Sequence, residues 1–254
     1  MKKSLDHPVA ITFTGGIDST VLTYWLLREV WPRFGQKPTR VYLLSANYGQ
    51  ANIGVTRELR SFHQGKLKEW KPDFDVWGVE VKVDIPAWSM GGGLFLPHFK
   101  PAEKCPEVVD LDPVEAAKRT YDYAYVDARN AFIFTTLMSW CVKEGIPLIY
   151  TGHQYDPVEW DFIDNYRHRQ EDFSPMFLDR MNLLAETGFR SRVRIEAPFN
   201  VFRLSKVDIV TLGHRLLGAE TLIEKTYSCQ FYPECGICPG CVAKQDALRE
   251  VYGA

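Results

Sequence analysis

Short apolar runs alternate along the chain with stretches in which apolar residues recur every three or four positions. The run at residues 9–13 is rich in β-branched side chains and predicts a buried parallel strand. After Asp18 the apolar positions keep helical spacing as far as Val30, and Pro32 and Gly35 are expected to end that helix. In residues 79–83 valines alternate with charged residues, which predicts a strand near a sheet edge. Further strands are predicted at 40–45, 148–150 and 193–196.

Helices are predicted between these strands. Apolar residues line one face of residues 55–62, and a longer helix is predicted from about residue 128 to 143. Ser205 and Asp208 have capping-box spacing and open a helix that is expected to continue through Leu217. The succession of strands and helices indicates an α/β fold, a doubly wound parallel five-stranded sheet. Ligands of such sheets bind beyond the C-terminal ends of the strands, where the loop after the first strand lies.

Two polar stretches interrupt this alternation. Residues 84–115 contain three consecutive glycines and five prolines, which is typical of an irregular insertion. A lid over a site and a mobile loop are both open interpretations of this insertion. Residues 153–180 carry many charges and aromatic side chains. The predicted division is a main α/β domain over residues 1–220 and a C-terminal segment over residues 221–254.

The charge balance excludes one broad class of function. Thirty basic residues stand against 32 acidic ones, which gives a formal net charge of −2 and a pI near 6.3. A general nucleic-acid binder needs a strongly basic face, so stable nucleic-acid binding is not expected. Apolar runs stay far below the roughly 20 residues that span a bilayer, and the residues before Pro8 lack the apolar segment of a secretory signal. A cytoplasmic protein without a membrane partner is expected.

The loop after the first strand combines two adjacent glycines with hydroxyl side chains. Gly15 and Gly16 let backbone amides approach an anion closely, and Ser19 and Thr20 add hydroxyl donors. The helix that follows points the positive end of its dipole at the same place. A tight strand-to-helix turn would use the same glycines, so a phosphate site and a plain turn both stay open at this point. The predicted binding residues are Phe13, Thr14, Gly15, Gly16, Ile17, Asp18, Ser19 and Thr20.

Four of the six cysteines gather near the C-terminus, at Cys229, Cys235, Cys238 and Cys241. In a cytoplasmic chain such a cluster indicates a metal site rather than disulfides. Four thiolates in a tetrahedron suit a closed structural Zn²⁺ site. An iron–sulfur cluster also uses four cysteines. Zinc is favoured because these four positions provide no additional cysteine for a redox reaction.

The segment Thr-Gly-Gly-Ile-Asp-Ser at residues 14–19 resembles the Ser-Gly-Gly-x-Asp-Ser signature of the PP-loop ATP pyrophosphatases. The resemblance implies that the main domain binds ATP and cleaves it between the α and β phosphates, with the loop holding the pyrophosphate. Asp18 would then orient Mg²⁺, because a hard cation prefers carboxylate and phosphate oxygens. The alternative role for Asp18 is to cap the helix behind it.

A PP-loop followed by a C-terminal four-cysteine segment resembles the 7-cyano-7-deazaguanine (preQ0) synthases of the queuosine pathway. Softer likenesses in the middle of the chain agree with this family. The implied substrate-binding residues are Tyr48, Gln50, Arg129, Asn130 and Asp156, and the implied catalytic residues are Asp18, Ser19, Arg129 and Lys206. Arg129 and Lys206 would neutralise phosphates or the substrate carboxylate, although either could be a solvated surface charge.

The resemblance implies an ATP-dependent ligase that adenylates 7-carboxy-7-deazaguanine and condenses it with ammonia, with ATP, Mg²⁺ and Zn²⁺ as cofactors. The family's Tyr-Pro-Asp-Cys-Arg segment is replaced at residues 166–171, and Lys244 stands where an arginine is usual. A ligase that stops at the amide and modifies a protein amine in antiphage defence is therefore the main alternative. A tRNA-thiolating enzyme and a non-catalytic ATP-binding module are weaker ones, and a homodimer stays open.

Overall fold

A computed structural model describes residues 6–85, 128–154, 175–189, 192–229 and 231–253. Most of the insertion predicted at 84–115, together with Asp156 and the segment 166–171, lies outside the described residues.

Five parallel strands form one sheet in the order β3-β2-β1-β4-β5. Their bounds are Val9–Thr12 for β1, Val41–Asn47 for β2, Val76–Lys82 for β3, Leu148–Tyr150 for β4 and Arg194–Glu196 for β5. The strand order reverses between β1 and β4, and this switch point is where such sheets bind ligands. The doubly wound, five-stranded prediction is confirmed, and β3 lies at a sheet edge as its alternating pattern predicted.

The first helix ends where the sequence pattern predicted. Helix α1, Ile17–Trp25, continues without a break into a π-helical turn, η1, Leu26–Val30, and a short helix α2, Trp31–Arg33. Pro32, which has no amide to donate, directly follows the π-helical turn and lies in α2. The chain turns away at Gly35, which has a φ of +61°.

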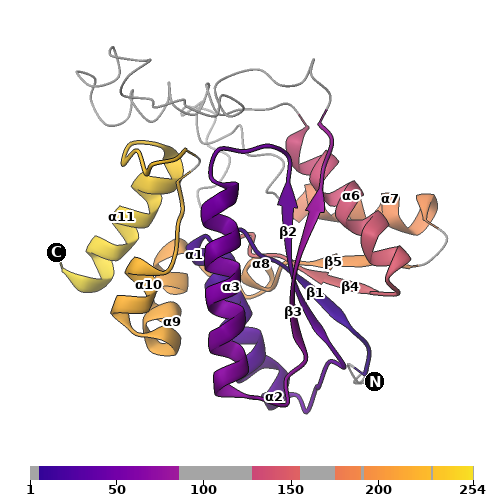
Figure 1. Cartoon of the computed structure of the whole chain (residues 1–254), viewed down its shortest axis with the longest axis horizontal. Coiled ribbons are helices and arrows are strands. Elements are labelled where there is room, and N and C mark those ends of the chain that lie inside the picture. The colour runs from indigo at the N-terminus through magenta and orange to yellow at the C-terminus, as the bar shows by residue number, and fades with distance from the viewer. Residues whose placement is uncertain (1–5, 86–127, 155–174, 190–191, 230, 254) are drawn as a thin grey trace.

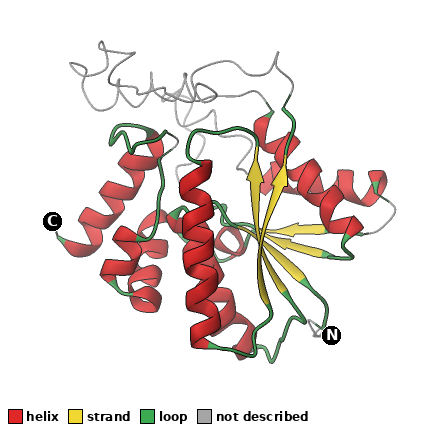
Figure 2. Ribbon diagram, viewed as in Figure 1, coloured by secondary structure: helices red, strands yellow, loops and turns green. Residues whose placement is uncertain are grey.

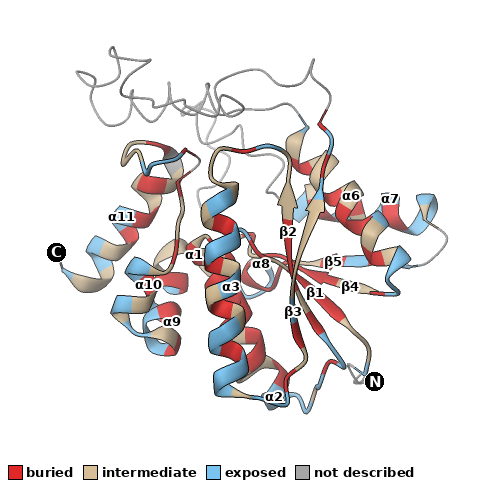
Figure 3. Ribbon diagram, in the orientation of Figure 1, coloured by how far each residue is buried: buried red, intermediate tan, exposed pale blue. Residues whose placement is uncertain are grey.

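Helices cover both faces of the sheet (Figures 1 and 2). On one face α1 packs with α3, Ile53–Trp70, and α9, Lys206–Leu217, over a core that includes Val9, Ile11 and Leu43. On the other face α6, Arg129–Lys143, and α7, Pro175–Gly188, pack over Ala10, Leu44 and Ile149. Successive residues of one strand thus serve opposite cores, as the red core positions in Figure 3 illustrate.

Several helices were not predicted. They are α7, α8 (Pro198–Val201), α10 (Ala219–Glu224) and α11 (Pro239–Tyr252). The start of α7 lies within residues 153–180, which were interpreted as a polar stretch. Its exposed apolar residues Met176, Leu183 and Leu184 obscure the buried stripe of Leu178, Met181 and Ala185. The capping box of α9 is confirmed: the Ser205 hydroxyl accepts from the amide of Asp208, whose carboxylate accepts from the Ser205 amide.

The C-terminal helices lie beside α1 and α3, at the left in Figure 1. Helix α11 packs on α9, and a small third core at its start contains Val83, Ile85 and Phe231 together with three cysteines. The domain boundary predicted at residue 220 falls within α10, and the division itself stays a prediction. No helix in the described ranges has the length and apolar character needed to cross a membrane.

Candidate functional site: a phosphate loop beside a four-cysteine cluster

The loop between β1 and α1 has a conformation that depends on its first glycine. Gly15 has a φ of +77°, and a Cβ at this position would lie 2.9 Å from Cδ1 of Leu59 on α3. Gly16 is the N-cap of α1, and no side chain caps that helix start. The first-turn amides of α1 are therefore free of side-chain caps beside the exposed Thr14, which is the arrangement that binds anions at helix N-termini.

The predicted binding residues of the loop divide into two sets. Phe13, Ile17 and Thr20 are fully buried and belong to the core, so their side chains do not face a ligand. The hydroxyl of Ser19 donates to the Gly16 carbonyl at 3.1 Å and accepts from the Thr14 amide at 3.2 Å. Ser19 thus holds the loop in shape, and the part open to solvent consists of Thr14, Gly16 and Asp18.

Two of the predicted catalytic residues meet at this loop. The Lys206 Nζ donates to both carboxylate oxygens of Asp18, each at 2.7 Å, from the first residue of α9. The side chains are 16% and 31% exposed for Lys206 and Asp18, so the pair can be reached from solvent. Asp18 does not cap α1, because Gly16 occupies the cap and the carboxylate is engaged by Lys206. A cation and a carboxylate are thereby held at the mouth of the loop.

The end of β4 lies against the start of α1. A Cβ on Gly152 would lie 3.0 Å from both the carbonyl carbon of Asp18 and the amide nitrogen of Ser19, so only glycine fits there. Beside it, the Thr12 hydroxyl donates to that of Thr151 at 3.1 Å, and Thr151 lies 2.7 Å from Nδ1 of His153. Burial lowers the pKa of His153 to about 4, so this imidazole is neutral.

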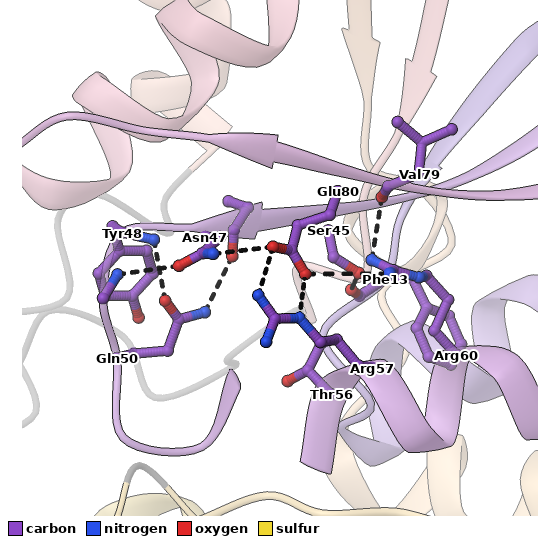
Figure 4. Close-up of polar contacts among 12 residues, drawn as sticks. Phe13, Ser45, Asn47, Tyr48, Gln50, Thr56, Arg57, Arg60, Val79 and Glu80 are labelled. Atoms are coloured by element: carbon purple, nitrogen blue, oxygen red, sulfur yellow. Dashed lines mark hydrogen bonds and ion pairs between the residues drawn. The ribbon is translucent and has the colours of Figure 1, made fainter. Parts of the chain in front are cut away.

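Tyr48 and Gln50 follow β2 in a loop that a polar network fixes (Figure 4). The Gln50 side chain is buried; its amide donates to the Ala46 carbonyl at 2.8 Å and its oxygen accepts from the Tyr48 amide at 2.9 Å. Gln50 therefore shapes the loop from within, whereas the half-buried Tyr48 is the residue of this pair that a ligand can reach.

Glu80 on β3 anchors the same loop from below. Arg57 binds its carboxylate through two bonds of 2.6 and 2.7 Å, and Asn47 donates to it at 2.8 Å. The guanidinium of Arg57 is the main cause that lowers the pKa of Glu80 to about 2. Asn47 in turn accepts from the Gly49 amide at 3.1 Å, so the network reaches from the sheet edge to the loop.

Arg129 and Asn130 stand at the start of α6, after Ala128, which has a φ of +56°. Arg129 is half-buried, and Asn130 is 8% exposed. Within the described part of the chain, Nδ2 of Asn130 has no hydrogen-bond partner, and Asn130 does not cap α6. A buried amide without a partner is costly, so its donor is available to a ligand.

The four clustered cysteines converge on one point. Their sulfurs all lie within 4.8 Å of one another, with Cys229 at 3.5 Å from Cys235 and Cys238 at 3.5 Å from Cys241. Backbone amides also point at the sulfurs: those of Phe231 and Cys235 donate to Cys229 at 3.4 and 3.3 Å. Such donors stabilise thiolate charge.

The spacing of the sulfurs fits a single ion. Tetrahedral bonds of about 2.3 Å to one metal place sulfurs about 3.8 Å apart. Three of the six sulfur pairs are 3.5–3.8 Å apart, and all lie within 4.8 Å of one another. In a [4Fe–4S] cluster each thiolate binds a different iron atom around a larger body. The cysteine cluster can therefore hold a metal, and its spacing agrees better with a mononuclear centre.

Sequence reasoning missed several residues that complete this region. His153 was left without a role because nothing in the sequence shows that it is buried beside the loop. Asn52 donates to the Cys229 carbonyl at 2.8 Å, and the Tyr227 amide donates to the Gly15 carbonyl at 2.8 Å. Both contacts join distant segments, and backbone partners leave no signature in side-chain patterns.

Comparison with known proteins gives concordant results. The family model of the queuosine biosynthesis protein QueC matches residues 94–252, well over half of the chain. A 7-cyano-7-deazaguanine synthase of Methanococcus maripaludis strain C5 is 30% identical over 93% of this chain and 92% of its own. One of Pyrococcus abyssi is 27% identical over 96% and 93%.

Other matches are partial or distant. The synthase of M. maripaludis strain C7 is 30% identical, but the match spans only 57% of this chain and 60% of that protein. A solved structure, U34-tRNA thiolase NcsA from M. maripaludis with its [4Fe-4S] cluster, aligns over 99% of this chain and 72% of its own. Its TM-score is 0.46 and its identity 14%.

Proposed function

The chain belongs to the family of the queuosine biosynthesis protein QueC, and from that premise we propose that it is an ATP-dependent 7-cyano-7-deazaguanine synthase. The observation that carries the proposal is the Asp18–Lys206 pair at the mouth of an uncapped helix start. Relatives that match nearly the whole chain are named for this activity.

In the first step ATP activates the substrate carboxylate, which by itself is a poor electrophile. A carboxylate oxygen of 7-carboxy-7-deazaguanine attacks the α-phosphorus, the bond to the β-phosphate breaks, and pyrophosphate leaves. The loop amides around Gly16 and the Lys206 ammonium would hold the phosphates and neutralise the charge that develops. When bound, Mg²⁺ would add charge neutralisation, and Asp18 is the carboxylate placed to hold it.

In the second step an amine displaces AMP from the acyl-adenylate. Ammonia attacks the acyl carbon, AMP leaves, and loss of a proton gives the amide. A second ATP adenylates the amide oxygen, and departure of AMP with a proton leaves the nitrile. Tyr48, Arg129 and Asn130 would bind the deazaguanine, and the unpaired Nδ2 of Asn130 would be a donor for an acceptor on the base. Asp156 belongs to the same proposed set but lies outside the described residues.

We assign the cysteine cluster to a structural zinc ion. All four positions of a tetrahedral site are taken by thiolates, which leaves no open position for substrate or water. Such an ion would contribute folding free energy to the C-terminal segment and no chemistry of its own.

The test is an assay with purified protein, 7-carboxy-7-deazaguanine, excess ammonium and ATP. Mass spectrometry should detect 7-cyano-7-deazaguanine together with AMP and pyrophosphate. Lys206→Ala should abolish all three products, because it removes the cation at the loop, whereas Lys66→Ala should not. Lys66 is a matched control because it is an exposed lysine that pairs with Glu69 on the same helix. Formation of ADP, or no dependence on the deazaguanine acid, would refute the proposal.

The identity of the amine is decided by the same assay. The alternative, attachment to a protein amine in antiphage defence, depended on residues 84–115 and 166–171, of which only 84 and 85 are described. The relatives reported above are named for the synthase and none for protein modification, so the alternative gains no support from them. A product that stalls at the amide despite excess ammonia would revive it.

A further inference from the structure

We propose that the cysteine cluster sets the conformation of the phosphate loop through residues 226–229, so that metal binding tightens nucleotide binding as well as holding the C-terminal segment. We call residues 226–229 the bridging segment. The identity of the nucleotide rests on the proposed function, whereas the coupling between the metal site and the loop does not depend on it.

At one end the bridging segment contacts the loop directly. The amide of Tyr227 donates to the carbonyl of Gly15 at 2.8 Å. The Tyr227 carbonyl lies 3.8 Å from the point that a Cβ on Gly16 would occupy. The segment therefore packs against both glycines that form the phosphate site.

On the opposite side the loop cannot retreat, because α3 blocks it. The Thr56 hydroxyl donates to the Thr14 carbonyl at 3.0 Å, and a Cβ on Gly15 would lie 2.9 Å from Leu59. The loop is held between α3 and the bridging segment, so its shape depends on both. Helix α3 contributes Leu59 and Leu67 to the main core, whereas Tyr227 of the bridging segment is partly buried and packs against both that core and the cysteine cluster.

At its other end the bridging segment is part of the metal site. Cys229 is its last residue, and the Cys229 carbonyl accepts from Asn52 at 2.8 Å. A Cβ on Gly240 would lie 2.2 Å from the Ser228 carbonyl oxygen, so the start of α11 packs tightly on the segment. Lys244 on α11 donates to the Thr226 carbonyl at 2.9 Å. Only Ser228 separates Tyr227, which holds Gly15, from the metal ligand Cys229.

This arrangement predicts how metal binding reaches the nucleotide. A metal ion ties Cys229 to Cys238 and Cys241 on α11 and thus fixes both ends of the bridging segment. Without that tie the Tyr227–Gly15 hydrogen bond opens more often, and the loop must be ordered by the nucleotide itself. Loss of about one hydrogen bond predicts a three- to tenfold weaker affinity for the non-hydrolysable analogue AMP-PNP.

The first experiment measures hydrogen–deuterium exchange of the full chain without nucleotide, before and after chelation of the metal. Peptides covering residues 12–20 should exchange faster after chelation, while those covering β2 at 41–47 stay protected. If the loop peptides keep their protection while those of 226–252 lose it, the coupling does not exist. If β2 also loses protection, chelation has unfolded the whole chain, and the proposal of a local effect is wrong.

The second experiment keeps the metal and weakens the bridging segment by Asn52→Ala. Asn52 occupies the N-cap of α3 but makes no capping bond, so the substitution removes its bond to Cys229 without uncapping the helix. We expect the metal content to stay unchanged, faster exchange in peptides covering 12–20, and weaker AMP-PNP binding.

The matched control is Asn182→Ala. It breaks two comparable bonds to the backbone of Ile195, at 2.9 and 2.7 Å, on the far face of the sheet. Equal loop exchange in both variants would overturn the proposal. Because exchange is read without nucleotide or substrate, a chain that makes no 7-cyano-7-deazaguanine can still confirm the coupling, and the two proposals fail separately.

Discussion

The phosphate loop is held by hydrogen bonds to other groups of the chain. The cysteine cluster instead brings four sulfurs together, and such an arrangement is stable when the thiolates bind a common ion. Thr14, Ser19 and Thr56 hold the loop through hydrogen bonds, and the β1 core lies directly beneath it. Beneath the cysteines the described core contains Val83, Ile85 and Phe231 besides three of the cysteines themselves.

The difference shows how the two regions get their stability. The large sheet core orders β1 and α1, and these two elements hold both ends of the loop. The cysteine-bearing start of the C-terminal segment has little apolar area of its own, although α11 packs Ala247 into the main core further along. Small cores of this kind are usually completed by a metal or by disulfides. The two regions should therefore respond unequally to the same perturbation, and the following predictions test that from the largest effect to the smallest.

Metal removal should affect the two regions most unequally. Chelation, or Cys238→Ser, should unfold the 226–252 region, since the metal-binding free energy of structural zinc sites, about 10–16 kcal/mol in small peptides, is folding free energy. Elemental analysis should give about one zinc per chain in the wild type. Circular dichroism and limited proteolysis measure the loss of folded structure at residues 226–252. The control is Cys141→Ser, at a buried cysteine outside the cluster, which should retain the zinc. Iron with sulfide, or no metal in the wild type, would contradict this.

Asp18→Ala should produce the converse result. We expect the synthase activity to fall by at least about 10²–10³-fold, because charge stabilisation at the phosphates is lost. Stability should change by about 1 kcal/mol or less, because the pair is partly exposed and solvent screens it. Activity assays measure the loss of turnover, and chemical denaturation measures the free energy of unfolding. The zinc content should equal that of the wild type. Asp246→Ala, which breaks an exposed pair with Arg249, is the control. Unfolding of Asp18→Ala would make Asp18 a structural residue.

Sequence patterns predicted the elements that local signals define. Apolar runs predicted the strands, the capping box predicted α9, and cysteine spacing predicted the metal-binding cluster. Helix α11 was missed because its first turn was interpreted only as a ligand segment. Helix α7 was missed because exposed apolar residues such as Met176 and Leu183 blur its buried stripe. The Asp18–Lys206 contact joins the starts of α1 and α9, so the family resemblance named both residues but could not show that they pair.

Other parts of the site depend on burial, which a single sequence does not show. Gln50 stays a predicted substrate residue, and the structure adds that its side chain is buried and bonds to the end of β2 and to the Tyr48 amide. His153 has a role only because the chain folds it against Phe134, with ring centroids 5.5 Å apart, and behind Thr151. A polar residue in a loop predicts neither of these environments.

Lowering the pH should reduce the stability of the native state through His153, which lies beside the phosphate loop. Burial lowers the pKa of His153 to about 4, below the value near 6.5 in the unfolded chain. The native state then binds fewer protons, so the stability from this residue is complete above pH 6.5 and is lost as pH falls toward 4. Between pH 7 and pH 5 the loss is about 2 kcal/mol.

The measurement is urea denaturation at both pH values for wild type and His153→Gln, followed by a probe in the sheet. The variant should be less stable at pH 7 but lose about 2 kcal/mol less than wild type on going to pH 5. His214→Gln, at an exposed histidine on α9, should keep the wild-type pH dependence. Equal pH dependence in wild type and His153→Gln would show that His153 is not buried in its neutral form.

The smallest effect concerns the helix that presents Lys206 to the loop. Ser205→Ala removes the capping box of α9, which should cost about 1 kcal/mol of stability. Because Lys206 is the first residue of that helix, fraying should also loosen its bonds to Asp18 and raise the KM for ATP slightly, with zinc content unchanged. Denaturation and steady-state kinetics measure both. Ser139→Ala, which removes an exposed hydroxyl bonded to the Thr135 carbonyl within α6, is the control and should change stability by less than about 0.5 kcal/mol. If Ser205→Ala released zinc, the cysteine cluster would depend on α9, and weakening the loop side would affect both regions alike.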